Sequence, residues 1–141
     1  LAGKIDGADF VTYCLLGDGE MQEGQVWEAV MAAGHYKLNK LVAIVDDNKY
    51  QIDGATADVM NIEPVDEKFK SFGWHVIKCK GHEISEVIKA LDACDSVKDK
   101  PIAIIADTIK GKGVSFMEGT EKWHGKAPNE EELAKALKEL E

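Results

Sequence analysis

The chain lacks any apolar run of the roughly 18 residues that a membrane-spanning helix requires, and no signal peptide opens it. Positive charge is also scarce, because 17 lysine and arginine residues stand against 26 acidic ones and give a formal net charge of −9. No basic stripe is visible that could follow a nucleic acid backbone. We therefore expect neither a membrane nor a nucleic acid partner.

Cysteine and proline are rare as well, at three residues each. Cys14, Cys79 and Cys94 are odd in number, widely spaced and embedded in apolar patterns, which predicts buried, reduced thiols rather than disulfides or zinc ligands. Reduced thiols fit a cytoplasmic protein. With no proline-rich linker, repeat or low-complexity tract, the 141 residues and their 45% apolar content indicate one domain with one core and no second domain.

Apolar patterns alternate between strand and helix periods along the whole chain. Strands are expected at 10–16, 41–45, 74–78 and 101–106, and helices at 26–33, 66–72, 84–91 and 129–140. Gly34 is expected to end the first helix, and Ile84, Val87, Ile88 and Leu91 to form the core face of the third. This alternation predicts a doubly wound α/β fold, with a mainly parallel sheet and helices on both faces.

The two ends of the chain differ in character. Leu1 is not an initiator methionine, and only a short polar lead precedes the first strand, so we expect the chain to start within the end of an earlier helix. At the other end, Asn129 can cap a helix whose apolar face carries Leu133, Ala136, Leu137 and Leu140. Residues 1–141 are therefore expected to form part of a larger domain.

Asp18 and Asn48 carry the strongest functional signal. Asp18 follows the strand at 10–16 within Gly17-Asp18-Gly19-Glu20, and Asn48 follows the strand at 41–45 within Asp46-Asp47-Asn48. The 30 positions between them are about the length of a strand–helix–strand unit, so the carboxyl ends of the two strands should lie side by side. Ligands bind at that edge of open α/β sheets, and carboxylate and amide oxygens suit Mg²⁺ or Ca²⁺. Two polar turns after core strands would give the same residues without a site.

Gly-Asp-Gly followed at this distance by a strand-closing Asn resembles the thiamine diphosphate fingerprint. The stretch from Gly17-Asp18-Gly19-Glu20-Met21-Gln22-Glu23-Gly24 to Asp46-Asp47-Asn48-Lys49-Tyr50-Gln51-Ile52-Asp53-Gly54 is more narrowly similar to the transketolase family. The resemblance implies that Asp18, Asn48 and the backbone carbonyl of Tyr50 ligate Mg²⁺, for which Ca²⁺ or Mn²⁺ can substitute. It also implies that Gly17, Gly19, Glu23, Asn48 and Ile52 serve the cofactor. Glu23 would do so at the contact between the two cofactor-binding halves.

A second element follows the strand at 101–106. Thr108-Ile109-Lys110-Gly111-Lys112-Gly113 and Trp123-His124-Gly125-Lys126-Ala127-Pro128 resemble the family's Thr-x-x-Gly-x-Gly segment and its histidine loop. The resemblance gives His124 a catalytic and diphosphate-binding role. Many relatives carry another histidine three residues earlier, where this chain has Glu121, and this departs from the family's hydrogen bonding in the channel.

The resemblance implies the carboxyl-terminal part of a diphosphate-binding domain or subunit of a transketolase. Such an enzyme transfers a two-carbon ketol unit between sugar phosphates in the pentose phosphate pathway and forms a homodimer or heterotetramer. The required pyrimidine-binding domain or subunit has no counterpart in this sequence, so the chain alone should be inactive. Alternatives are deoxyxylulose phosphate synthase, dihydroxyacetone synthase, a pyruvate dehydrogenase component, or a non-catalytic cation-dependent signalling module that uses Asp46 and Asp47.

Overall fold

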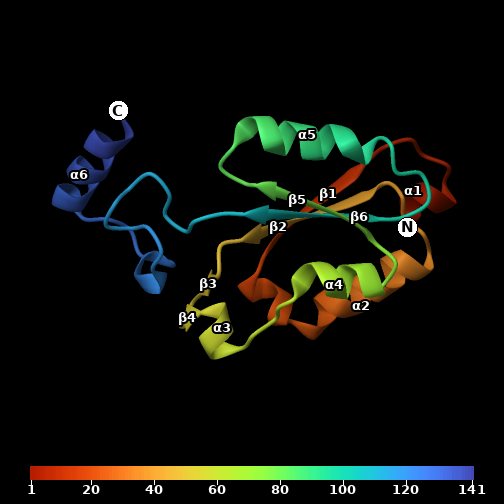
Figure 1. Cartoon of the computed structure of the whole chain (residues 1–141), viewed down its shortest axis with the longest axis horizontal. Coiled ribbons are helices and arrows are strands. Elements are labelled where there is room, and N and C mark those ends of the chain that lie inside the picture. The colour runs from red at the N-terminus through yellow and green to blue at the C-terminus, as the bar shows by residue number, and fades with distance from the viewer.

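A four-stranded parallel sheet forms the centre of the molecule in this computed structural model, which describes residues 1–141 (Figure 1). Its strands are β1 (Thr12–Gly17), β2 (Leu41–Asp47), β5 (His75–Lys80) and β6 (Ile102–Asp107). They lie in the order β1-β2-β6-β5, and all three pairings are parallel. The α/β class predicted from the sequence is confirmed.

Helices cover both faces of the sheet. They are α1 (Ala2–Ile5), α2 (Gly24–His35), α3 (Thr56–Val59), α4 (Val65–Ser71), α5 (Ile84–Cys94) and α6 (Glu130–Leu140). Figure 1 shows α5 on one face, α2 and α4 on the other, and α6 beyond the carboxyl ends of the strands. The hairpin β3 (Tyr50–Gln51) and β4 (Gly54–Ala55) follows β2, and two 3₁₀ turns span Gly19–Gln22 and Glu121–Trp123. No helix combines the length and the apolar character needed to cross a membrane.

The central strands β2 and β6 feed two separate cores, because alternate side chains point to opposite faces. On the α2 and α4 face, Ala43 and Val45 pack with Phe69, the largest fully buried side chain. On the α5 face, Ile102 and Ile104 form part of the second cluster. The near-continuous burial of β6 explains its unbroken apolar sequence.

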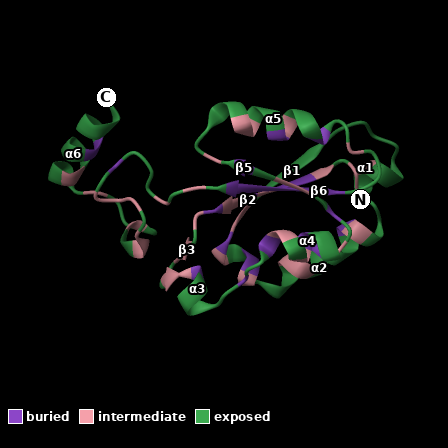
Figure 2. Cartoon of the chain, in the orientation of Figure 1, coloured by how far each residue is buried: buried purple, intermediate pink, exposed green.

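The strand β1 differs from its prediction as a buried core strand. It lies at an edge of the sheet and pairs only with β2, so Leu15 is 71% exposed and Tyr13 is also exposed (Figure 2). Cys14 is exposed too, which corrects its expected burial, whereas Cys79 and Cys94 are buried free thiols as predicted. Apolar composition identified the strand but not its neighbours.

The predicted helix faces are only partly buried. On α5, Val87 and Leu91 pack against the second core, but Ile84 is 71% exposed and Ile88 is also exposed. The buried positions of α5 are Ala90 and Cys94. On α6, Ala136 is buried, whereas the leucines of its apolar face, Leu133, Leu137 and Leu140, are exposed. Periodicity therefore marked faces wider than those this chain covers.

Gly34 does not end its helix as expected. The helix α2 continues to His35, with Tyr36 as its C-cap. A Cβ atom at Gly34 would lie 2.0 Å from the carbonyl oxygen of Phe72, so the glycine permits close approach of another segment's backbone. The glycine thus serves packing rather than helix termination.

Candidate functional site

The carboxyl ends of β1 and β2 bring Asp18 and Asn48 to one edge of the sheet, as the sequence predicted. Gly17 pairs with Asp46 in the parallel register, and the amide of Asp18 donates to the carbonyl of Asp46 at 3.2 Å. The 3₁₀ turn starts directly after Asp18, and Asn48 directly follows β2. Both side chains are therefore placed by the ends of neighbouring strands.

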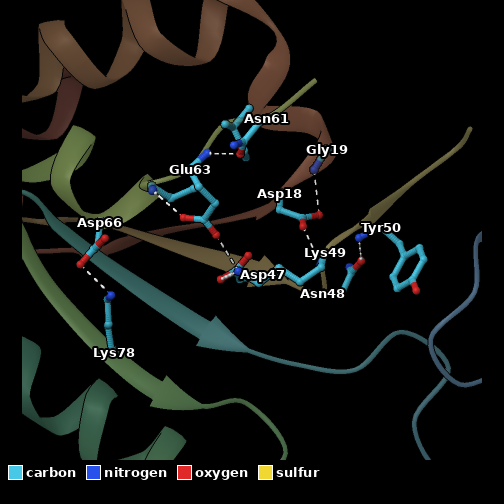
Figure 3. Close-up of polar contacts among 12 residues, drawn as sticks. Asp18, Gly19, Asp47, Asn48, Lys49, Tyr50, Asn61, Glu63, Asp66 and Lys78 are labelled. Atoms are coloured by element: carbon cyan, nitrogen blue, oxygen red, sulfur yellow. Dashed lines mark hydrogen bonds and ion pairs between the residues drawn. The ribbon is translucent and has the colours of Figure 1, made fainter. Parts of the chain in front are cut away.

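Asp18 is a buried carboxylate, with only 1% of its surface exposed. Its Oδ1 accepts from the amide of Gly19 at 2.8 Å, and its Oδ2 accepts from the amide of Lys49 at 2.6 Å (Figure 3). No lysine or arginine side chain pairs with it. Burial raises its pKa above the usual range, while the two backbone hydrogen bonds act in the opposite direction. The site thus holds a negative charge that this chain does not neutralise.

Asn48 is oriented by hydrogen bonds at both ends of its side-chain amide. Its Nδ2 donates to Oδ2 of Asp46 at 2.9 Å, and its Oδ1 accepts from the amide of Tyr50 at 3.0 Å. Asp46 also accepts from the hydroxyl of Thr108, which follows β6. A contact between the segments after β2 and β6 therefore reaches the predicted ligand.

An ion-pair cluster beside Asp18 was not predicted from the sequence. Nζ of Lys49 lies 2.5 Å from Oδ2 of Asp47 and 2.7 Å from Oε1 of Glu63 (Figure 3). Asp47 is only 7% exposed, so the lysine neutralises a second buried carboxylate of this edge. Desolvation lowers the pKa of Lys49, but hydrogen bonds with both acids outweigh it and leave the pKa raised, while the same contact lowers the pKa of Glu63. The acidic pair Asp46-Asp47 was the available signal; its lysine partner required the fold.

The conformation of Lys49 links the two parts of the site. Its φ of 68° lies in the left-handed region, which lets the amide reach Asp18 while the side chain turns to Asp47. A lysine in this region costs about 1–2 kcal/mol of backbone energy. The surrounding contacts oppose that cost.

The two glycines of Gly-Asp-Gly differ in their surroundings. A Cβ atom at Gly19 would lie 2.7 Å from Cβ of Gln51, so Gly19 is required by the approach of the β3 hairpin. A Cβ atom at Gly17 would have only Cβ of Glu20 within reach, at 3.9 Å. Packing within this chain accounts for Gly19 but leaves room beside Gly17.

The remaining predicted residues are not gathered around Asp18. Glu23 is exposed at the N-cap of α2 and makes no side-chain capping hydrogen bond. Ile52 lies in the turn between β3 and β4 and is 69% exposed. His124 is exposed in the loop after β6, where its Nδ1 lies 3.3 Å from Nζ of Lys110. These residues present apolar, acidic and basic groups to the exterior near the carboxyl end of the sheet.

The donors around Asp18 fit a hard divalent cation. Histidine, cysteine, aspartate and glutamate form no group of three or more suited to a metal, so a cluster of charged ligands is absent. The available set is instead one buried carboxylate, the Asn48 amide oxygen and nearby backbone carbonyls such as that of Tyr50. Such a set leaves room for phosphate oxygens, which commonly complete a Mg²⁺ shell.

Comparison with known proteins identifies what the chain resembles. The family model described as "Transketolase, thiamine diphosphate binding domain" matches residues 3–141. One of the two subunits of an apulose-4-phosphate transketolase from Phocaeicola vulgatus is 44% identical over 140 residues, covering 99% of this chain and 50% of the relative. A 6-deoxy-6-sulfo-D-fructose transketolase subunit of a Clostridium species is 43% identical over 141 residues, or 51% of its length.

A solved structure agrees with these sequence relatives. Transketolase from Campylobacter jejuni superposes with a TM-score of 0.86 at 38% identity, over 94% of this chain and 21% of that chain. The chain spans about half the length of the curated subunits it matches. It covers only 19% of Rattus norvegicus transketolase, over 122 residues at 43% identity.

Proposed function

Because the chain belongs to the transketolase family, as part of its thiamine diphosphate-binding domain, we propose that it holds the diphosphate end of that cofactor through Mg²⁺. The single observation that carries this proposal is the buried carboxylate of Asp18, which has no cationic partner and lies at the same sheet edge as Asn48. A buried charge is costly unless it is compensated, and a divalent cation would compensate it.

The residues of this chain would bind and orient the cofactor. Asp18, the Asn48 oxygen and the Tyr50 carbonyl would hold the cation, and the space beside Gly17 would admit the diphosphate. When bound, the cofactor supplies the nucleophilic carbon and electron sink for transfer of a two-carbon ketol unit from a ketose phosphate to an aldose phosphate. The domain 1–141 would thus supply positioning and charge rather than the carbon chemistry itself.

The loop residues and the exposed surfaces would complete the site. His124 and Lys110 form a basic pair suited to anionic phosphates, with His124 as the catalytic candidate. Glu23 and Ile52 are exposed, so a pyrimidine-binding domain or subunit could contact them directly. Activity would then require that partner, in a homodimer or a heterotetramer.

The names of the relatives suggest a more specific assembly. Two of the most similar curated proteins are named as transketolase subunits, which favours an enzyme divided between polypeptides. Their names mention apulose-4-phosphate and 6-deoxy-6-sulfo-D-fructose, so the donor here would belong to the same broad class of substituted ketoses. These transketolase relatives also favour this reaction over that of other thiamine enzymes.

Binding and transfer assays on the complete enzyme test the proposal. Asp18→Ala and Asn48→Ala should each weaken thiamine diphosphate binding measured by calorimetry in Mg²⁺, by about 100-fold or more for Asp18 because a charged ligand is lost. Asp53→Ala is the matched control, since Asp53 is an exposed acid in the nearby hairpin turn. Unchanged affinity in both site variants would refute the proposed cation site.

The dependence on a partner needs a separate measurement. Ketol transfer should appear only when the complete diphosphate-binding and pyrimidine-binding parts are mixed with Mg²⁺ and thiamine diphosphate. His124→Ala should then lower kcat by about 100-fold, as for a lost transition-state contact. Full transfer by the diphosphate-binding part alone would contradict the assignment of essential groups to the partner.

A further inference from the structure

Asp46 occupies a junction between the predicted cation ligand and the segment after β6. One carboxylate oxygen, Oδ2, accepts from Nδ2 of Asn48 at 2.9 Å, and the other, Oδ1, accepts from the hydroxyl of Thr108. Asp46 is half-buried at the end of β2, where it pairs in register with Ala106 of β6. Its two hydrogen bonds therefore join side chains that are 60 positions apart in the sequence, from Asn48 to Thr108.

The chemistry of these contacts fixes which end of the Asn48 amide points where. An ionised carboxylate only accepts hydrogen bonds, so Asp46 selects the NH₂ group of Asn48. The opposite end, Oδ1, accepts a single hydrogen bond, from the amide of Tyr50. A carbonyl oxygen has a second lone pair, which remains available to a cation.

Thr108 is itself held from two sides. The backbone amide of Thr108 donates to the carbonyl of Asp47 at 3.4 Å, which ties it to β2. On the other side, a Cβ atom at Gly81 would lie 2.4 Å from the Thr108 methyl group, so the turn after β5 lies directly against this side chain. Nε2 of His82 also accepts from the amide of Ile109 at 2.7 Å. These contacts limit the directions in which the Thr108 hydroxyl can point.

We propose that Asp46 and Thr108 are positioning residues for the cation site: the Thr108 hydroxyl holds Asp46, and Asp46 holds the Asn48 amide with its oxygen free to ligate. This inference rests on the proposed function, because it presumes that Asn48 binds the cation. It assigns to Asp46 a role other than that of ligand or phosphate acceptor. It also explains why a threonine side chain from the segment after β6 reaches the end of β2.

Threonine offers a matched pair of substitutions that separate its hydroxyl from its methyl group. Thr108→Val keeps the packing against Gly81 but deletes the hydroxyl, whereas Thr108→Ser keeps the hydroxyl and deletes the methyl. Thr12→Val serves as the control, because Thr12 is exposed in β1 and makes no side-chain hydrogen bond to another residue. The complete enzyme with its partner is titrated with Mg²⁺ at fixed thiamine diphosphate, and cofactor binding is followed by calorimetry.

Thr108→Val and Asp46→Asn should each raise the Mg²⁺ concentration for half-saturation by about 10- to 100-fold, the usual effect of removing a group that orients a ligand. Thr108→Ser should remain within about twofold of the unaltered enzyme, and the melting temperatures of all metal-free proteins should stay close together. Mn²⁺ in place of Mg²⁺, followed by electron paramagnetic resonance, gives a readout that does not depend on catalysis.

Two results would overturn the proposal. Wild-type Mg²⁺ dependence in Thr108→Val would show that the hydroxyl does not act on the site, and failure of Thr108→Ser to restore it would assign the effect to methyl packing. Asp18→Ala measured in parallel separates this inference from the proposed function. If Asp18→Ala abolishes Mg²⁺-dependent binding while Thr108→Val leaves it unchanged, the positioning role alone is wrong.

Discussion

Replacing Gly34 with alanine should destabilise the protein, although the same change stabilises most helices. Alanine is favoured over glycine by about 1 kcal/mol within a helix. Here the new Cβ atom would lie 2.0 Å from the carbonyl oxygen of Phe72 and 3.2 Å from its carbonyl carbon. The atom in the way is backbone rather than a flexible side chain, so α2 must move away from the end of α4 by about 1 Å or more, which is a case of overpacking.

Movement at this contact affects buried neighbours. Nε1 of Trp74 donates to the carbonyl of Val30 at 2.8 Å across the same junction, and Trp74 packs edge-on against Phe69. Overpacking costs about 1–3 kcal/mol and a weakened hydrogen bond about 1 kcal/mol more. After subtracting the gain in helix propensity, we expect the free energy of unfolding to fall by about 1–3 kcal/mol.

Gly24→Ala provides the control within the same helix. Nothing lies within 4 Å of a Cβ atom at Gly24, so only the backbone preference changes and stability should rise by roughly 0.5 kcal/mol. Urea unfolding of both variants, followed by circular dichroism, should therefore shift in opposite directions with an unchanged slope. A Gly34→Ala protein as stable as the unaltered protein would refute the inferred backbone contact.

Three further predictions concern charges and helix ends. The raised pKa of Asp18 means that the metal-free protein loses stability as pH rises from the ordinary aspartate range through the raised value, so stabilisation by Mg²⁺, measured as a shift in melting temperature, should increase with pH across that window; a constant shift would contradict it. Lys49→Met should cost up to about 1 kcal/mol at neutral pH, because the lysine is half exposed, and the difference from wild type should shrink as pH falls through the lowered pKa of Glu63, where the acid protonates; chemical unfolding at several pH values tests this, and a difference that grows in acid would be the wrong sign. Asn129→Ala should remove the capping box with Glu132 and weaken the start of α6 by about 1 kcal/mol, seen as faster amide exchange at Glu132 and Leu133, whereas Glu130→Ala should leave that exchange unchanged because the Glu130 side chain makes no hydrogen bond there.

Local sequence was sufficient to predict the elements and the ends that carry the site. Strand periods and strand-closing polar residues identified β1 and β2, and their spacing predicted that Asp18 and Asn48 would share one edge. Helix chemistry at Asn129 likewise predicted its capping box. These features depend on residues close together in the chain, so a linear pattern contains the information.

Burial was less predictable because it depends on which elements become neighbours. The sequence of β1 is as apolar as that of a core strand, yet it lies at the sheet edge and exposes Leu15. Ile84 and Ile88 have the correct period for a core face but lie beyond the part of α5 that meets the sheet. Periodicity gives the direction of a side chain relative to its own element, not what lies opposite it.

The sequence by itself thus determined the α/β class, the family resemblance and the candidate ligands Asp18 and Asn48. Only the tertiary structure decided which groups surround them: Lys49 neutralises Asp47 rather than Asp18, and Thr108 reaches Asp46 from the neighbouring strand's end. The strand order β1-β2-β6-β5 places β6 beside β2, a neighbour that no local pattern specifies. The electrostatics of the site arise from that non-local pairing, because contacts between distant segments set which buried charges are compensated.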